Sequence, residues 1–188
     1  MWSNAGQRGI QMAYAHTDHS PVASARNLLV REAMSINPDY ILFVDADILY
    51  PANALLRLIA HEKDAIGSFY VARNPPYSPM GKLLDPTDPL PTGGLHRATQ
   101  FGMGFSLFKA SVFREVQAPW FYHQWNVGWA KDEKNPDGEI SEDITFCRSL
   151  AKYGIEMWTD LDLSYELGHI GQTIITVPRP TGLQAAAE

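Results

Sequence analysis

The chain has 188 residues, of which 45% are hydrophobic and 19% are charged, as expected of a single soluble globular domain. Its formal net charge of -6, with no block of Lys or Arg, argues against a nucleic-acid-binding surface and suits a protein that recruits a metal to hold an anionic ligand. One cysteine, Cys147, excludes an intramolecular disulfide, and neither a secretory signal nor a run of roughly 20 apolar residues is present, which favours a cytoplasmic protein without an integral membrane segment.

The first elements are read from apolar spacing and capping signals. Residues 11–15 predict a short strand. Ser20 and Pro21 are typical of a helix start, so a helix is expected over residues 21–34. Its apolar residues share one face, and Arg26 lies toward the edge of that face.

The strand at residues 41–44 is the element around which the chain is organised. Four apolar residues in a row are typical of a strand covered on both faces in a parallel sheet. Asp45 and Asp47 follow at its carboxyl end, where ligands bind in open α/β sheets, and they point the same way if the strand geometry persists. Two carboxylates on one side can hold a hard divalent cation. The alternative is that they only end the strand or cap the next helix, but Pro51 suits the first helical position and leaves Asp47 three residues too early.

A second helix is predicted over residues 51–61 and a further strand over residues 64–71. The alternation of strands and helices predicts an α/β fold with a mostly parallel central sheet flanked by helices. Residues 73–94 contain six prolines, which exclude a regular helix or central strand and predict a long loop. Loops of this length inside a domain are either functional or disordered.

The next predicted strand, over residues 101–108, contains Gly102 and Gly104. Glycines inside a strand indicate either the close approach of a ligand or another backbone, or a packing requirement, and the two are equally supported here. A short helix is expected over residues 109–116. An aromatic segment at 119–125 and a polar, turn-rich segment at 126–138 follow it.

The last strong helix is predicted over residues 144–153, with Ser141 as its cap and Gly154 as the residue that ends it. Met157 and Trp158 indicate a strand, and residues 161–167 its partner or continuation. We expect one domain over residues 1–188, with the two ends at 1–10 and 178–188 irregular. The oligomeric state is left open, and a homo-oligomer is compatible with the sequence.

The chain resembles the GT-A glycosyltransferases, in particular family-2-like members of bacteria and phages, because several of these segments occur in the order typical of that family. The resemblance covers roughly residues 12–171, and each piece is weak alone. The matching pieces are Ala25-Arg26-Asn27, Asp45-Ala46-Asp47, Gly102-Met103-Gly104-Phe105, Pro119-Trp120-Phe121, Ser141-Glu142-Asp143 and Gly168-His169-Ile170-Gly171.

The resemblance implies a single GT-A-like, Rossmann-like domain and a metal-dependent, inverting transferase of the hexosyltransferase kind. Such an enzyme moves a sugar from a nucleotide-diphosphate donor to a hydroxyl of a glycan or other acceptor. It implies a divalent cation that bridges the diphosphate, with Mn²⁺ favoured by a set of carboxylates plus one imidazole and Mg²⁺ as the alternative. A metal neutralises the charge that develops on the leaving diphosphate.

The resemblance also implies roles for single residues. Asp47 would be a direct metal ligand and His169 a further one, while Asp45 would contact the ribose or a metal-bound water. Asp143 would be the general base that takes the proton of the acceptor hydroxyl, and the opening turn of a helix favours its ionised form. The alternatives are that His169 is a surface or core histidine and that Asp143 only interacts with the helix dipole.

Further implied contacts concern the donor and the acceptor. Arg26 would reach the nucleotide or its phosphates, unless it is an exposed helix arginine. Gly104 would allow the donor to approach the backbone. Trp120 or Trp125 would stack on a sugar face, unless Trp120 is core, and Glu142 would contact the acceptor or order the loop.

The resemblance departs from the family at the N-terminus. These enzymes normally begin with a strand and loop that hold the nucleotide base, and here only ten residues precede Gln11. We therefore expect a nucleotide pocket built differently, or weak donor binding. The rival hypotheses are a non-catalytic nucleotide- or sugar-binding module that retains the fold and a nucleotidyltransferase on a similar sheet. Sugar transfer needs Asp143 as a base, whereas a binding module would keep its function without that carboxylate.

Overall fold

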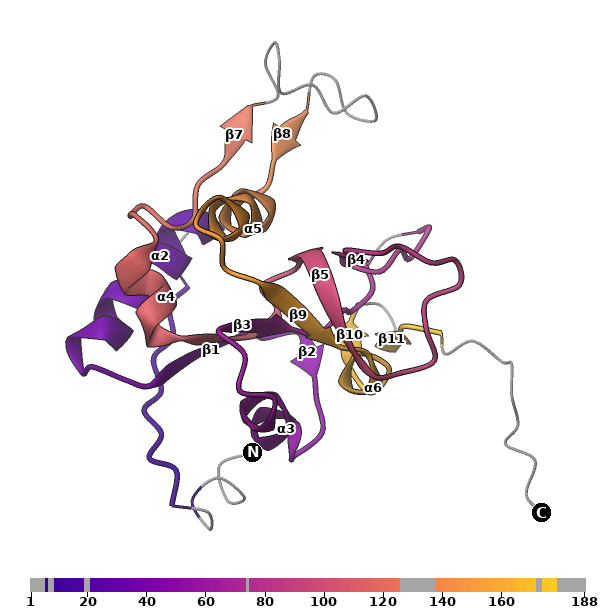
Figure 1. Ribbon diagram of the computed structural model, residues 1–188, viewed down its shortest axis with the longest axis horizontal. Helices are drawn as coiled ribbons and strands as arrows, with labels where there is room; N and C mark the ends of the chain where they lie inside the picture. The colour runs from indigo at the N-terminus through magenta and orange to yellow at the C-terminus, as the bar shows by residue number, and fades with distance from the viewer. Residues whose placement is uncertain are drawn as a thin grey trace.

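The computed structural model describes residues 6, 9–18, 21–73, 75–125, 138–171 and 174–178, and it is an α/β structure as predicted (Figure 1). Its helices are α2 (Val22–Ser35), α3 (Ala54–Ala60), α4 (Ala110–Glu115), α5 (Glu142–Lys152) and α6 (Leu161–Ser164). Its strands are β1 (Tyr40–Val44), β2 (Ile48–Leu49), β3 (Ala65–Gly67), β4 (Gly81–Leu83), β5 (Leu95–Phe101), β6 (Phe105–Lys109), β7 (Gln124–Trp125), β8 (Glu139–Ile140), β9 (Met157–Asp160), β10 (Gly168–Ile170) and β11 (Ile174–Thr176).

The central sheet has six strands in the order β1-β6-β3-β9-β5-β4. Only the β3–β9 pair is parallel, so the expectation of a mostly parallel sheet is wrong. The reason is the position of β6, which lies between β1 and β3 and runs antiparallel to both, placing Leu107 opposite Leu42 on one side and Ile66 on the other. The order of elements along the chain does not reveal which strand is inserted between two others.

Helices cover both faces of this sheet. α2, α4 and α5 lie on one face and α3 and α6 on the other (Figure 1). Side chains of β1 alternate between the two layers, with Ile41 and Phe43 in the core under α2, α4 and α5 and Leu42 beside the other cluster. Because β1 stands at one end of the sheet, its two faces are less covered than the apolar run predicted: Val44 is exposed.

The core under α5 is aromatic. The ring of Phe108 lies 5.4 Å from that of Phe146 and 5.6 Å from that of Phe113, both edge to face. Phe146 also packs on Phe121 at 4.5 Å. Contacts of this kind add about 0.5–1.5 kcal/mol per pair to the burial of the rings. They fix α5, and with it the residues of its first turn, against the sheet.

Several predicted elements hold in the structure. The helix predicted at 109–116 is α4, and the strand at Met157 and Trp158 is β9. Gly154 follows the end of α5 with a φ of 73°, the left-handed conformation expected of a residue that ends a helix. Ser20, the expected cap of α2, lies outside the described residues, as does most of the segment 126–138.

Other predictions about local structure are wrong. Residues 11–15 form neither helix nor strand, because their side chains are mostly exposed and bury no common face. The helix predicted from Pro51 begins only at Ala54, after a turn in which the Ala54 N–H donates to the Pro51 carbonyl (3.0 Å). In place of a strand at 161–167, the chain forms the helical turn α6, whose Leu163 N–H is capped by the Asp160 carboxylate (2.8 Å).

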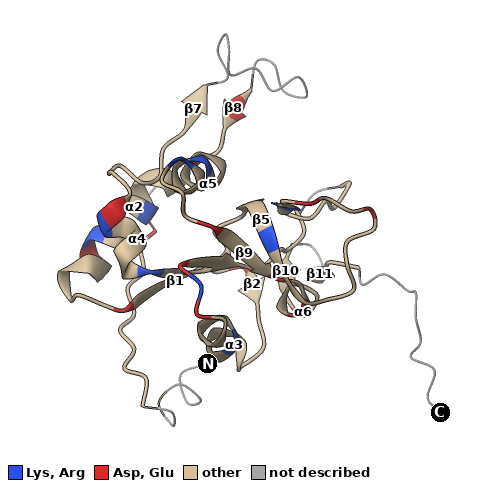
Figure 2. Cartoon of the chain, viewed as in Figure 1, with Lys and Arg blue, Asp and Glu red and all other residues tan. Residues whose placement is uncertain are grey.

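The region from the proline-rich segment to β6 also differs. β4 lies inside the segment predicted to be loop and pairs antiparallel with β5. The strand predicted at 101–108 is two strands of different position in the sheet, and residues 102–104 turn the chain from β5 to β6. Arg97 of β5 pairs with Glu156, the residue before β9 (2.8 Å). Figure 2 shows a basic residue on β5 and an acidic one where the chain enters β9. None of the helices in the described ranges is long and apolar enough to cross a membrane.

Candidate functional site

The two aspartates after β1 lie in a turn. β1 ends at Val44, and the Ile48 N–H donates to the Asp45 carbonyl (3.1 Å), which reverses the chain between the aspartates. The expectation that strand geometry continues and points both side chains the same way is therefore wrong. The Asp45 N–H donates to the Gly104 carbonyl (2.9 Å), which ties this turn to the one between β5 and β6.

His169 is brought to Asp47 by a small sheet in which β10 lies between β2 and β11. His169 is opposite Ile48 in the register, and the Ile170 N–H donates to the Asp47 carbonyl (2.8 Å). The imidazole Nε2 of His169 consequently lies 3.4 Å from the Oδ2 of Asp47. Residues 122 positions apart along the chain thus share one corner of the molecule, as the sequence predicted.

The hydrogen bond on the other ring nitrogen determines what His169 offers. Its Nδ1 lies 2.6 Å from the Val71 carbonyl oxygen, which can only accept, so Nδ1 carries a proton. In the neutral ring the lone pair is then on Nε2, the atom that lies 3.4 Å from the Asp47 carboxylate. This is the arrangement of a metal-ligating histidine, whose other ring N–H donates to a carbonyl or carboxylate.

Asp45 does not join this pair. Within the described ranges, no group of three or more His, Cys, Asp or Glu side chains is arranged to hold a metal ion. Both carboxylate oxygens of Asp45 lie 3.2 Å from Nη2 of Arg26 on α2. Of the three expected ligands, Asp47 and His169 are therefore a pair and Asp45 belongs to a neighbouring ion network.

Arg26 is the centre of that network. Its Nη1 also donates to Oε1 of Glu142 on α5, and both side chains are only 8% exposed. On the outer side, Nε2 of His123 lies 3.5 Å from Oε2 of Glu142. Because the Arg26 guanidinium and the Glu142 carboxylate face each other inside the protein, neither is free for the donor or acceptor contact expected of it.

Asp143 is held at the start of α5, next to a small cavity. Its Oδ1 accepts hydrogen bonds from the Ser141 hydroxyl and from the Ile144 N–H (2.8 Å). Ser141 stands at the cap position as predicted, but its hydroxyl binds Asp143 and no backbone N–H of the helix. Asp143 and Gly102 are among the residues that line the cavity, which has a volume of about 100 Å³.

Tyr70 joins the two halves of the site, and no role was predicted for it. Its ring lies edge to face with the His169 ring at 5.3 Å, and its hydroxyl accepts the Gly104 N–H (3.1 Å). Burial raises the pKa of Tyr70 far above its ordinary value, and the negative charges of Asp45 and Asp143 raise it further. Its hydroxyl is therefore a neutral hydrogen-bonding group with both carboxylates near it.

The two glycines before β6 make room for Tyr70. A Cβ at Gly102 would lie 2.3 Å from the Tyr70 hydroxyl oxygen, and one at Gly104 would lie 2.7 Å from the ring carbon Cζ. Of the alternatives raised by the sequence, the packing requirement is right, because a side chain of the same protein fills the space beside both glycines. The Gly104 N–H already donates to the Tyr70 hydroxyl. The expected role of Gly104 in donor binding remains a prediction.

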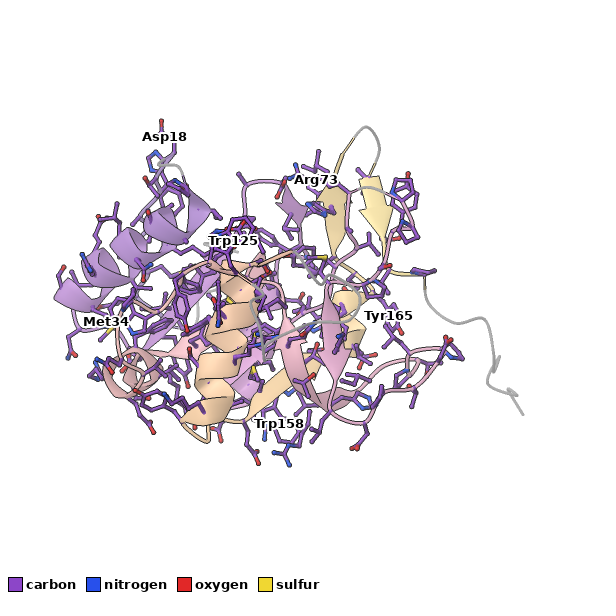
Figure 3. The ribbon with its side chains drawn as sticks, turned by 90° about the horizontal axis from the view of Figure 1, so that it is seen from above. Asp18, Met34, Arg73, Trp125, Trp158 and Tyr165 are labelled. Carbon is purple, nitrogen blue, oxygen red and sulfur yellow. The ribbon has the colours of Figure 1, made fainter. Side chains whose placement is uncertain are left out.

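The two tryptophans after α4 lie in different environments. Trp120 is 9% exposed, packs edge to face on Phe113, and donates its indole N–H to the Val116 carbonyl (2.9 Å). The expected stacking of Trp120 on a sugar does not fit this position, because the ring is part of the core. Trp125 of β7, labelled in Figure 3, is 64% exposed.

Three segments of the chain thus meet near Tyr70: the turn that holds Asp45 and Asp47, the first turn of α5 with Asp143, and β10 with His169. A larger hollow of about 410 Å³ lies elsewhere, against Trp158, on the edge opposite Arg73 in Figure 3. The sequence also missed Arg73, whose Nη1 lies 3.0 Å from Oδ2 of Asp47. The signal available for Tyr70 was the pair of glycines, which required a bulky neighbour, whereas nothing in the sequence set Arg73 apart from other loop arginines.

Comparison with known proteins yields a likeness in fold. No protein-family model matches the chain, and no curated protein matches its sequence. Among solved structures, the crystal structure of A197 from STIV superposes on it with a TM-score of 0.58 and 12% sequence identity, over 97% of this chain and 90% of that one. At this identity the match shows a shared fold and carries no statement about activity.

Proposed function

We propose that the protein is a metal-dependent, inverting glycosyltransferase with a GT-A-like domain. It would transfer a sugar from a nucleotide-diphosphate donor to a hydroxyl of a glycan or another acceptor. One observation carries the proposal: His169, which pairs with Asp47 as a candidate cation ligand, packs on Tyr70, and Asp143, the candidate base, lines a cavity with Gly102, which adjoins the Tyr70 hydroxyl. The resemblance of the sequence motifs to such enzymes is what assigns these roles to the three residues.

Asp47 and His169 suit a divalent cation as an incomplete ligand set. A carboxylate oxygen and an imidazole nitrogen together suit Mn²⁺, with Mg²⁺ second. Cations that act on phosphates commonly take only one or two protein ligands and complete their shell with water and phosphate oxygens. A cation bound there would supply Lewis-acid stabilisation of the leaving diphosphate. In this proposal Asp45 acts through Arg26 and through the turn that it opens, and its direct contact with donor ribose remains a prediction.

Asp143 would act as the general base through its second oxygen. Oδ1 is engaged by Ser141 and by the Ile144 N–H, which leaves Oδ2 to accept the proton of the acceptor hydroxyl. As that proton moves to Oδ2, the acceptor oxygen forms its bond to the anomeric carbon. The bond from that carbon to the donor phosphate oxygen breaks, and the diphosphate leaves with the electron pair. Attack opposite the leaving group inverts the anomeric centre.

Thermal unfolding with a panel of nucleoside diphosphates, each with and without Mn²⁺, tests the proposal. We expect one nucleotide to raise the Tm only when Mn²⁺ is present, by about 5–10 °C at a hundredfold excess over its Kd. Asp47→Asn should abolish this shift. The matched control Asp64→Asn, at an exposed aspartate that pairs with Lys109, should preserve it.

The other outcomes separate the alternatives. A metal-dependent shift without any sugar transfer identifies a binding module. Release of pyrophosphate from a nucleoside triphosphate identifies a nucleotidyltransferase. A wild-type protein that responds to no nucleoside diphosphate contradicts the proposal.

A further inference from the structure

Arg73 occupies the position next to Asp47 at which a positive charge is needed. Its Nη1 lies 3.0 Å from Asp47 Oδ2, the same oxygen that His169 Nε2 approaches to 3.4 Å. This oxygen therefore pairs with a guanidinium and lies close to the Nε2 of an imidazole. In the proposed function it is also a ligand of the cation.

Two arginines lie at this site, and they differ in what they can reach. The Arg26 side chain is buried between two carboxylates, so moving it toward a ligand would leave Glu142 unpaired inside the protein. The Arg73 side chain is 57% exposed and pairs with a half-buried aspartate. Such an exposed pair is weak, about 0–1 kcal/mol, so Arg73 can exchange this partner for another at little cost.

The backbone that carries Arg73 is anchored beside the site. The Val71 carbonyl accepts from His169 Nδ1 (2.6 Å), and Val71 forms a bridge with Pro79. The Ala72 N–H donates to the Ser78 carbonyl (3.0 Å). The backbone before Arg73 is therefore held next to His169, whereas the guanidinium at the end of the side chain can move.

We infer that Arg73 is a phosphate-binding residue that rests on Asp47 when no ligand is present. A divalent cation on Asp47 and the guanidinium repel each other, because both are positive and would share one oxygen. The cation therefore displaces Arg73, whose planar N–H donors then meet a phosphoryl oxygen of the diphosphate on the same cation. Arg73 thereby takes the phosphate contact that the resemblance implied for Arg26. The inference rests on the proposed function.

The substitution Arg73→Gln is expected to change two binding affinities in opposite directions. Loss of the competing guanidinium should raise the affinity for Mn²⁺ alone about two- to fivefold. Loss of the phosphate contact should lower the affinity for a nucleoside diphosphate in saturating Mn²⁺ by about ten- to a hundredfold. Isothermal titration with Mn²⁺ alone, then with UDP, GDP, ADP and CDP in Mn²⁺, measures both on the full chain. Arg73→Lys, a point charge without the fork, should recover part of the second loss.

The control is Arg97→Gln, at another exposed arginine paired with a carboxylate, which should change neither affinity. Affinities that both fall in Arg73→Gln indicate a structural role and overturn the inference. The inference is also overturned if the wild-type protein binds a diphosphate and Arg73→Gln binds it with the same affinity. A wild-type protein that binds Mn²⁺ but none of the four diphosphates overturns the proposed function, and the inference with it.

Discussion

Asp143→Asn is expected to lower the rate of sugar transfer by about 10²- to 10⁴-fold, the usual contribution of a positioned general base. An amide oxygen at the Oδ1 position can still accept from the Ser141 hydroxyl and the Ile144 N–H, so the start of α5 should keep its structure. The amide cannot take the proton of the acceptor hydroxyl. Single-turnover transfer, measured with the donor nucleotide that the thermal-unfolding panel identifies, gives the rate.

The donor-binding readout separates chemistry from folding for this variant. Asp143→Asn should show the same Mn²⁺-dependent Tm shift as the wild-type protein, and Asp64→Asn should keep both the shift and the rate. A transfer rate within tenfold of wild type in Asp143→Asn shows that another group takes the proton. The cavity of about 100 Å³ beside Asp143 would then have no assigned role.

Arg26→Met is expected to lower the free energy of unfolding by about 3–5 kcal/mol. The substitution keeps part of the apolar stem but removes the guanidinium from between Asp45 and Glu142. The cost arises mainly at Glu142, whose carboxylate is buried and, among the described side chains, would keep the His123 imidazole at 3.5 Å as its neighbour. Equilibrium unfolding in urea measures the change.

A second variant identifies the cause of that loss. Glu142→Gln, combined with Arg26→Met, removes the buried charge and should recover a large part of the lost stability, because burying a neutral pair costs less than burying one unpaired ion. Arg97→Met, at an exposed ion pair, should change stability by less than about 1 kcal/mol. A loss of under about 1 kcal/mol for Arg26→Met would mean that water reaches Glu142 and that the network contributes little.

The local parts of the fold were predictable from the sequence, and the long-range parts were not. The apolar run before Asp45 indicated β1, and the Ser141 and Gly154 signals indicated α5. The prediction of strand direction was wrong at β6. The hydrophobic pattern does not distinguish a strand that lies beside the preceding one from a strand inserted between β1 and β3. The turn between Asp45 and Ile48 was hidden for a similar reason, since the run Asp45-Ala46-Asp47 followed by Ile48 and Leu49 reads equally well as a continuing strand.

At the site, the sequence identified positions better than partners. Asp47 and His169 were predicted to meet, and the β2–β10 pairing brings them together. Arg26 and Glu142 were expected to face ligands, but each satisfies the charge of the other. A single sequence shows that both residues are charged, whereas burial decides whether a charge serves the ligand or the protein. Tyr70 was missed because a buried aromatic residue in an apolar segment looks like any core residue.

Anomalous scattering from Mn²⁺, in crystals grown with Mn²⁺ and the nucleoside diphosphate that stabilises the protein, locates the cation itself. We expect a peak about 2.0–2.6 Å from a carboxylate oxygen of Asp47 and near Nε2 of His169, with Arg73 moved from Asp47 to the phosphate. A peak at another site, with Arg73 still paired to Asp47, would contradict this expectation.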